Sequence, residues 1–380
     1  MKSFISTFIF IFAALLLSSC KEKNAHSLVT QSPDKNEIQY AKGLEIYKRK
    51  GYSILKITQP WPGTTTPFTY ILKEKNGVIP DSLKKYTSIS VPIQSIVVTS
   101  TTHIPALELL GVENTLIGFP NTDFISSPKT RKRIDAGLVK EVGTNETLNT
   151  EILIDMAPDA IVSFGLNNSN PTLDNLQKSG LKVLLNGDWN EQSPLGKAEW
   201  IKFFGALYGL DTKAKVIFST IEKEYKTTLA LAKKAKQKPT VLSGAMYQDQ
   251  WFVPQGESWM ALFLKEAQSN YLWANTKGTG SLTLPFETIL EKAQKAEFWI
   301  APGDFTSLKE MNNSNPHYAK FDAFQNKKVY SYALHKGAKG GILFFEWSST
   351  RPDWVLKDLI AIFHPELVPQ HHPYFFEKLN

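Results

Sequence analysis

EILIDMAPDAIVSFG, at residues 151–165, shares its pattern with ETILEKAQKAEFWIAPG, at residues 287–303. Both segments begin with a glutamate, which is followed at matching positions by two aliphatic residues, an acidic residue and two alanines. In both, the apolar spacing predicts a short helix that leads into a buried strand and a glycine turn. Any α/β protein contains helix–strand units, so coincidence is the alternative. The shared register favours a unit that occurs twice, 136 residues apart.

Strands and helices alternate on both sides of these segments. In the first half we expect strands at 93–100, 115–120, 159–165 and 181–188, and helices at 103–111, 149–158 and 172–180. In the second half we expect strands at 240–247, 250–256, 296–303 and 327–333, and helices at 258–268, 285–294 and 353–363. This alternation predicts parallel sheets that are covered by helices.

A long helical stretch, residues 193–238, separates the two halves. Its apolar residues Ile217, Ile221, Tyr225 and Leu229 recur every four positions, which is one face of a helix. An interruption is expected near Gly209, and Pro239 is expected to end the helix. The predicted fold class is therefore α/β, with two Rossmann-like lobes (93–192 and 239–380) joined by a single long backbone helix. In such a fold the strand ends of both lobes face a common cleft.

The N-terminal part of the chain has a different composition. Lys2, an apolar run of about 14 residues and the small residues before Cys20 have the layout of a signal peptide, and the run is shorter than a membrane span. Leu17-Ser18-Ser19-Cys20 also resembles the lipobox of bacterial lipoproteins, which implies lipidation of Cys20. The alternative is a spare cysteine in an ordinary signal anchor. We expect a signal peptide (1–19), a flexible tether (20–36) and a β-rich extension (37–92).

The net charge of the chain is modestly positive. It is +7 in full and +6 without the predicted signal peptide, which contains only Lys2 as a charged residue. The densest basic cluster, Lys233, Lys234, Lys236 and Lys238, ends a predicted helix, where cations interact favourably with the helix dipole. This cluster is therefore interpreted as a solvated helix end, and no nucleic-acid partner is expected of an exported chain.

From about Ile93 to Leu367, the chain resembles the substrate-binding proteins of ABC importers that carry ferric siderophores, haem and cobalamin. Four segments carry the resemblance, in order: SIVVTSTTHIPALELLG, EVGTNETLNTEILIDMAPDAIVSFG, TLPFETILEKAQKAEFWIAPG and FFEWSSTRPDWVLKDLIAIFHPEL. The long helix lies where the backbone helix of that family lies. The β-rich extension departs from the basic family pattern.

The resemblance implies a role for the two glutamates that begin the repeated unit. In that family these positions dock into arginine pockets of the membrane permease, which here points to Glu151 and Glu287. A carboxylate on each lobe can form a charge-assisted pair with an arginine, and two separate pairs fix orientation. Each glutamate could instead, or in addition, stabilise the first turn of its helix.

The predicted ligand site consists of residues in the loops that follow the strands. They are Thr101, Thr102, His103, Asn121, Gly165, Leu166, Asp188, Trp189, Tyr247, Trp251, Trp259, Pro302, Gly303, Phe344, Trp347 and Arg351. Large chelates bind by broad aromatic contact with a few polar anchors. The resemblance implies that Phe344 contacts the chelate, and Arg351 is a candidate partner for a ligand anion. For each aromatic residue, core packing is the alternative, and it is preferred for Trp200 and Trp299.

Metal ligation by the protein itself is not expected. His103 is predicted at the cleft, where it could also hydrogen-bond the turn between strand and helix. The remaining histidines show no zinc-like spacing, and a carrier of a bare metal ion needs about four convergent ligands. No resident cofactor is predicted.

The sequence is compatible with three classes of function to different degrees. The first is a lipid-anchored monomer that delivers a ferric siderophore, or alternatively cobalamin or haem, to ABC permease subunits. The second is an exported enzyme, which the absence of G-x-S-x-G, P-loop and H-E-x-x-H motifs disfavours. The third is a surface lipoprotein that captures ligand or matrix without an importer. In each case we expect an exported chain in the cell envelope; which leaflet holds the anchor stays open.

Overall fold

The computed structural model describes residues 35–64, 66–167 and 169–380. The predicted signal peptide, the lipidation site Cys20 and nearly all of the predicted tether lie outside the described residues. Residues 36–380 form one compact unit. Over the described part of the chain, no helix combines the length and apolarity that crossing a membrane requires.

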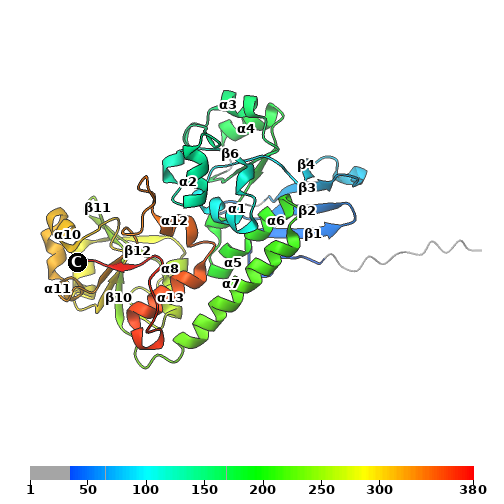
Figure 1. Cartoon of the computed structure of the whole chain (residues 1–380). Coiled ribbons are helices and arrows are strands. Elements are labelled where there is room, and N and C mark those ends of the chain that lie inside the picture. Colours follow the sequence, from blue (N-terminus) through cyan, green and yellow to red (C-terminus); the bar gives the residue numbers. More distant parts are fainter. Residues whose placement is uncertain (1–34, 65, 168) are drawn as a thin grey trace, which may run out of the picture. The chain divides into compact units, whose positions relative to one another are not determined.

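A five-stranded parallel sheet forms the first lobe (Figure 1). Along the sheet its strands are β7 (Lys140–Glu141), β6 (Leu116–Phe119), β5 (Ile96–Val98), β8 (Ala160–Ser163) and β9 (Val183–Leu185). Ile96 and Val98 belong to one core, whereas Val97 between them belongs to another. Since the sheet is covered on both faces, its central strand β5 is apolar throughout.

Helices cover the two faces of this sheet. Helix α1 (Ile104–Leu110) contributes to the core that contains Ile96, and helices α3 (Thr150–Met156) and α4 (Pro171–Lys178) contribute to the core that contains Val97. Helix α2 (Pro128–Asp135), which was not predicted, follows β6. The predicted alternation of strands and helices in this lobe is confirmed.

The second lobe is built on another five-stranded sheet. Its order is β13 (Asn270–Tyr271), β10 (Thr240–Ser243), β15 (Phe298–Ile300), β16 (Val329–Ser331) and β17 (Glu377–Lys378). The first four strands are parallel, and β17 is antiparallel to β16. The helices of this lobe are α8 (Trp259–Glu266), α9 (Phe286–Ala293), α10 (Leu308–Ser314), α11 (Asp322–Gln325), α12 (Leu343–Trp347) and α13 (Pro352–Phe363).

The single strand predicted at 240–247 is in fact two strands. Gly244, with a φ angle of 86°, separates β10 from β11 (Ala245–Tyr247). A Cβ at this position would lie less than 3.0 Å from the carbonyl oxygen of Phe252, so glycine allows the close approach. Strand β11 instead joins a separate antiparallel sheet with β12 (Gln250–Pro254) and β14 (Ser281–Pro285).

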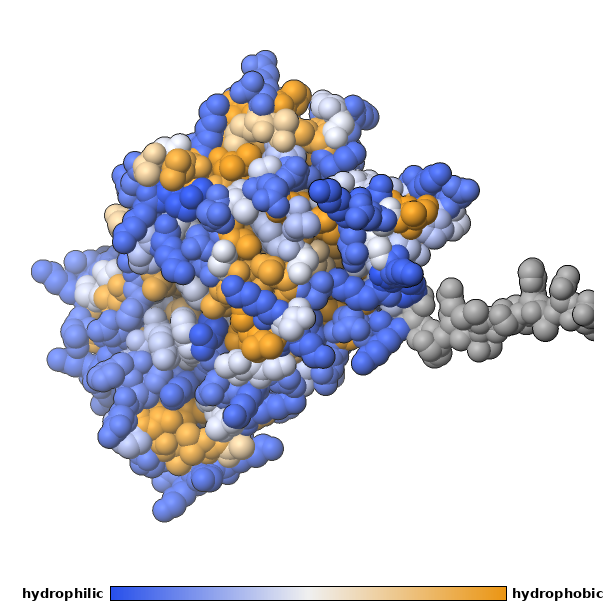
Figure 2. Space-filling model, turned by 45° about the vertical axis from the view of Figure 1, so that its right-hand side comes forward, coloured by the Kyte–Doolittle hydropathy of each residue, from blue (hydrophilic) through white to orange (hydrophobic). Residues whose placement is uncertain are grey.

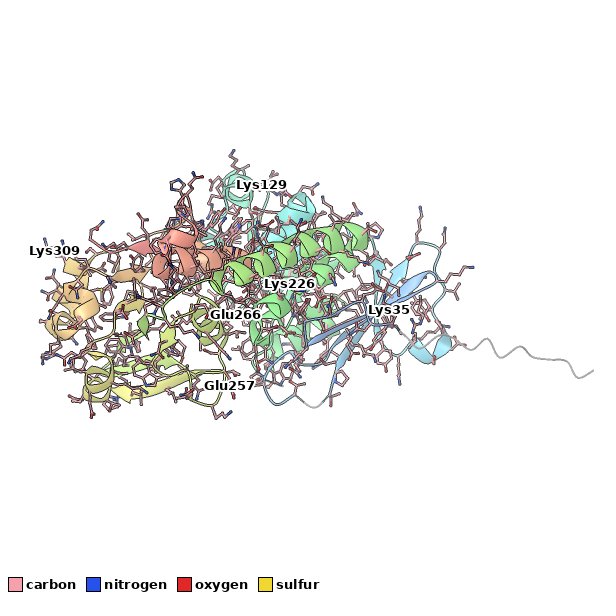
Figure 3. The ribbon with its side chains drawn as sticks, turned by 90° about the horizontal axis from the view of Figure 1, so that it is seen from below. Lys35, Lys129, Lys226, Glu257, Glu266 and Lys309 are labelled. Carbon is pink, nitrogen blue, oxygen red and sulfur yellow. The ribbon has the colours of Figure 1, made fainter. Side chains whose placement is uncertain are left out.

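Three helices fill the connecting region: α5 (Pro194–Glu199), α6 (Ile201–Leu207) and α7 (Asp211–Ala232). The predicted interruption near Gly209 is confirmed. The predicted end at Pro239 is wrong, because the chain turns directly after Ala232, with a hydrogen bond from the Lys234 N–H to the Leu231 carbonyl. Helix α7, which carries Lys226 in Figure 3, packs Phe218 into the core of the first lobe and Tyr225 into that of the second.

The predicted β-rich extension is a four-stranded sheet. Strands β1 (Leu44–Arg49), β2 (Tyr52–Ile57) and β3 (Phe68–Glu74) are antiparallel, and β4 (Thr87–Val91) is parallel to β3. Its side chains share one core with the first lobe. The Tyr70 hydroxyl accepts the Leu185 N–H (3.0 Å) from β9, which is the edge strand of the first-lobe sheet. The extension is therefore built into the first lobe.

Two buried carboxylates hold the N-terminal end of the extension. Glu199 in α5 accepts the backbone N–H groups of residues 39–41 at 2.6–3.1 Å, and Glu191 accepts those of Lys42 (3.1 Å) and Gly43 (2.7 Å). Since hydrogen bonds to charged groups are the stronger ones, this arrangement fixes the start of the extension against the connecting helices.

Candidate functional site

A cavity of about 250 Å³ lies between the two lobes. The first lobe contributes residues at the carboxyl ends of β5, β6 and β8, and the second lobe contributes a segment that leads into α12. The lining residues are Thr99, Ser100, Thr101, Phe119, Pro120, Phe124, Asn145, Phe164, Gly341, Ile342 and Phe345. Because the carboxyl ends of parallel strands meet at one edge of a sheet, these residues converge although they are distant in sequence.

The lining combines aromatic rings with hydroxyl and amide groups. Phe124 from the first lobe is 60% exposed, and Phe345 from the second lobe is 50% exposed. Large exposed aromatic side chains on both walls of a cavity can stack on a ligand. Apolar residues also gather in separate patches elsewhere on the surface (Figure 2), so exposure alone does not locate the site. The position of this cavity between the two lobes identifies it as the candidate site.

A second cavity, of about 290 Å³, adjoins the first. Asn145 and Phe164 line both. The other residues of the second cavity are mostly polar: Glu146, Leu148, Ser163, Leu166, Asn167, Ser169, Asn170, Pro171, Thr172 and Leu173. A larger groove along α7 is lined by residues of that helix and by Lys234 just after it, and it is open to solvent, so it is not an inter-lobe site.

A hairpin of the second lobe, residues 335–342, reaches the first lobe. The hairpin is closed by the Gly337 N–H, which donates to the Gly341 carbonyl (2.8 Å). A Cβ on Gly341 would lie less than 3.0 Å from the carbonyl oxygen of Phe124, and a Cβ on Gly337 would lie 2.5 Å from the Cα of Ser126. Glycine at both positions therefore allows the hairpin to lie directly on the first-lobe backbone.

A buried carboxylate joins the lobes beside this hairpin. Glu346, 1% exposed, accepts the backbone N–H groups of Ser126 (2.6 Å) and Ser127 (3.0 Å). Burial raises the pKa of Glu346 to about 7, against the lowering effect of the Ser126 N–H, and the nearby Glu108 carboxylate raises it further. Glu108 itself accepts the Ser127 hydroxyl (2.6 Å). One serine thus links carboxylates from both lobes.

His103 lies behind the cavity and not on its wall. It is fully buried, with its ring centroid 5.5 Å from that of Phe204, and neither ring nitrogen has a hydrogen-bond partner among the described residues. Burial lowers the pKa of His103, and the Asp188 carboxylate opposes this. Burial therefore favours the neutral form of the ring, which packs against Phe204.

Of the other residues predicted for the site, few line the cavities. Thr101 lines the first and Leu166 the second. Trp189 (38%) and Tyr247 (67%) are exposed but line neither of these cavities. The same two cavities also lack Thr102, Asn121, Gly165, Asp188, Trp259, Pro302, Gly303 and Trp347.

Two predicted aromatic contacts belong to the core instead. Trp251 is fully buried, with its ring centroid 5.1 Å from that of Trp299. Phe344 is 3% exposed and stacks on Tyr332 with ring centroids 4.9 Å apart. Because α12 begins at Leu343, consecutive side chains point to different sides of the helix, and Phe345 takes the exposed position.

The side chain of Arg351 makes its contacts within its own lobe. Its guanidinium donates to both carboxylate oxygens of Asp353 (2.9 and 2.6 Å) and lies 3.8 Å from the ring centroid of Trp354. It is absent from the lining of both cavities. An arginine that is paired in this bidentate and stacked manner is held by its own lobe.

The lining residues that sequence reasoning missed fall into two groups. Phe119 ends β6, and Pro120 and Phe164 directly follow β6 and β8, so the rule that identified Thr101 could have found them. Phe124, Asn145 and Phe345 carry no such signal, since the segments that contain them reach the cavity only through the tertiary fold.

The two candidate docking glutamates occupy equivalent positions. Glu151 lies in the first turn of α3 and Glu287 in that of α9, and both are exposed. In α3, the Asn149 side chain accepts the Ile152 N–H (3.0 Å) and so caps the helix. The cap leaves the glutamate available to solvent.

Two α/β lobes with a cavity between them define the class of two-lobed solute-binding proteins. A model of the periplasmic binding protein family matches residues 96–333, and the chain belongs to this family. Its class is therefore that of a binding protein and not of an enzyme.

The chain is also similar to individual known proteins, in sequence or in fold. An uncharacterized lipoprotein of Methanocaldococcus jannaschii is 25% identical over 389 residues, covering 94% of this chain and 90% of that protein. A periplasmic binding protein from Veillonella parvula has a similar structure (TM-score 0.59, 13% identity), with 82% of this chain and 98% of that chain covered. A periplasmic heme binding protein from Pseudomonas aeruginosa is similar as well (TM-score 0.57, 18% identity, 76% and 98% covered).

Proposed function

We propose that this chain is an exported, lipid-anchored binding protein that captures a metal chelate and delivers it to the permease of an ABC importer. The observation that carries the proposal is the cavity between the lobes, with an exposed aromatic residue on each side. A ferric siderophore is the first candidate cargo, and cobalamin and haem are the alternatives. A heme binding protein among the structures of similar fold is consistent with cargo of this kind.

The arrangement of potential metal-binding side chains bears on whether the cargo is a chelate or a bare metal ion. Within residues 35–64, 66–167 and 169–380, no group of three or more histidine, cysteine, aspartate or glutamate side chains is placed to hold a metal ion. A chelate brings its own metal ligands and requires from the protein only shape and polar anchors.

The size of the cavity bears on how the cargo enters. Pockets for drug-sized ligands are typically about 300–1,000 Å³, which is more than the inter-lobe cavity offers. We propose that the hairpin of residues 335–342 moves away from the first lobe to admit the chelate. Helix α7, which packs into both cores, then keeps the lobes attached.

Native mass spectrometry and absorbance titration of the full-length protein in detergent test this function. Ferric siderophores, cobalamin and haem are titrated in turn, and tight one-to-one binding of one of them is expected. If none of them binds, the chelate proposal is overturned, and surface capture of another ligand takes its place.

We propose that Glu151 and Glu287 dock the lobes onto the permease. Glu151→Gln and Glu287→Gln should leave the Kd for the cargo unchanged and lower uptake into cells by at least about tenfold, which corresponds to one lost charged contact of 1.4 kcal/mol. Asp155→Asn and Glu291→Gln on the same helices are matched controls, because both residues are also exposed. Unchanged uptake in both docking variants would refute the docking role.

We propose that Cys20 carries the lipid. The name of the Methanocaldococcus jannaschii relative, a lipoprotein, supports an anchored family member. Cys20→Ser should move the protein from the membrane fraction to the soluble fraction of fractionated cells. Retention of the variant in the membrane fraction would mean that another segment holds it there.

A further inference from the structure

We infer that the cargo presents an electrically neutral surface to the cavity, and that anionic chelates are discriminated against. The inference rests on the proposed function and adds the charge class of the ligand.

The lining of the inter-lobe cavity carries no formal charge. All of its lining residues, as far as the described chain shows, are aliphatic, aromatic, hydroxyl-bearing, amide-bearing, proline or glycine. The second cavity has one charged residue in its lining, the acidic Glu146. An anion that enters would lose water without gaining a cation, which is unfavourable. Glu146 is exposed, so its charge is screened by salt and adds little to this effect.

Two basic side chains considered for the site form contacts elsewhere. Lys197 is buried and donates to the carbonyl oxygens of Asp188 and Trp189, each at 2.9 Å. Arg351 forms its bidentate pair with Asp353.

Arg131, next to the Phe124 loop, also makes its contacts with other residues of the first lobe. It is 6% exposed, donates to the Thr122 carbonyl (2.9 Å), and lies between Asp123 (3.8 Å) and Asp135 (3.3 Å). On the hairpin, Lys336 and Lys339 are exposed to water, and neither belongs to the lining of a cavity. Exposed charges are screened by salt and supply little selectivity.

The groups that are present suit a neutral ligand. The faces of aromatic rings carry partial negative charge, so Phe124 and Phe345 favour neutral or cationic groups and disfavour anions. Thr101 and Asn145 offer hydrogen-bonding groups of both kinds, as neutral amide, hydroxamate or hydroxyl groups require. A ferric trihydroxamate, which has no net charge, fits this description, whereas a ferric tricatecholate carries three negative charges.

The experiment compares four probes on the full-length protein in detergent by titration calorimetry. The probes are a neutral ferric trihydroxamate, a trianionic ferric tricatecholate, cobalamin and haem, which carries two propionates. The neutral probes should bind at least about 100-fold more tightly than the anionic ones, which corresponds to about 2.7 kcal/mol. Equal or tighter binding of an anionic probe overturns the inference and leaves the proposed function intact. Absence of binding by all four overturns both.

A variant with a cation at the junction of the two cavities tests the location. Asn145 is exposed and lines both cavities, so Asn145→Lys should be tolerated and should tighten binding of the tricatecholate by at least about tenfold. Asn313→Lys, on the exposed surface of α10, is the matched control and should have no effect. Equal affinity of both variants for the tricatecholate would overturn the assignment of the charge class to this cavity.

Discussion

The carboxylate of Glu346 accepts a hydrogen bond of 2.6 Å from the backbone N–H of Ser126, which precedes it by 220 residues. Ser126 belongs to the first lobe and Glu346 to α12 of the second, so this bond and its neighbour from Ser127 join the lobes next to the cavity. A buried acceptor that serves two backbone donors contributes to the relative position of the lobes and, through its ionisation, makes that position sensitive to pH.

Glu346→Gln is expected to remove part of the pH dependence of stability. The pKa of Glu346 is raised from 4.5 to about 7 by burial, so between these values the folded state holds a proton that the unfolded state has released. The stability from Glu346 is therefore fully present below pH 4.5 and is lost as the pH rises through 7. From about pH 5 to pH 8 the loss is on the order of 2–3 kcal/mol.

Chemical denaturation of the wild type and of Glu346→Gln at both pH values measures this loss. The unfolding free energy of the variant should fall less between the two pH values than that of the wild type. Since other buried acids titrate in both proteins, the difference between the two isolates Glu346. Identical pH dependence would mean that Glu346 has an ordinary pKa in the folded protein.

Gly341→Ala should loosen the hairpin of residues 335–342. The added Cβ would lie less than 3.0 Å from the carbonyl oxygen of Phe124, so the hairpin has to move. Overpacking of this kind lowers the free energy of unfolding by about 1–3 kcal/mol. Amide hydrogen exchange of the hairpin should become faster. Gly280→Ala is the control, because its Cβ would meet only Gln255 at 3.5 Å; equally fast exchange in both variants would count against the close contact.

Phe345→Ala and Phe344→Ala should have opposite effects on binding and on stability. Phe345 is 50% exposed at the cavity, so its removal should weaken cargo binding by about tenfold at nearly unchanged stability. Phe344 is 3% exposed within an aromatic cluster, so its removal should lower the free energy of unfolding by about 3–5 kcal/mol. Titration and denaturation of both variants check the pair. A binding defect confined to Phe344→Ala would mean that Phe344, as predicted from the sequence, contacts the cargo.

Glu199→Ala should destabilise the first lobe together with the extension. The carboxylate is fully buried, accepts the N–H groups of residues 39–41 and pairs with Lys202 at 2.6 Å. Removal of one partner from a buried charged network lowers the free energy of unfolding by about 3–5 kcal/mol. Glu224→Ala, at an exposed position of α7, is the control. Denaturation midpoints that agree between the two variants would show that the extension is held by other contacts.

Local periodicity in the sequence was sufficient to predict the α/β alternation, the β-rich extension and the long connecting helix. These features depend on residues close together in the chain, such as the four-residue spacing of Ile217, Ile221 and Tyr225. The equivalent positions of Glu151 and Glu287 were predicted in the same way, because each follows from the register of a single helix–strand unit.

The tertiary structure alone decided which residues face the cavity. Phe344 and Phe345 are neighbours with the same side chain, and only the packing of α12 against Tyr332 determines which of them is buried. Likewise, Glu346 meets Ser126, and Gly341 meets Phe124, through contacts between segments about 220 residues apart. No local pattern encodes such contacts, because they arise from the sum of many weak packing interactions across the whole fold.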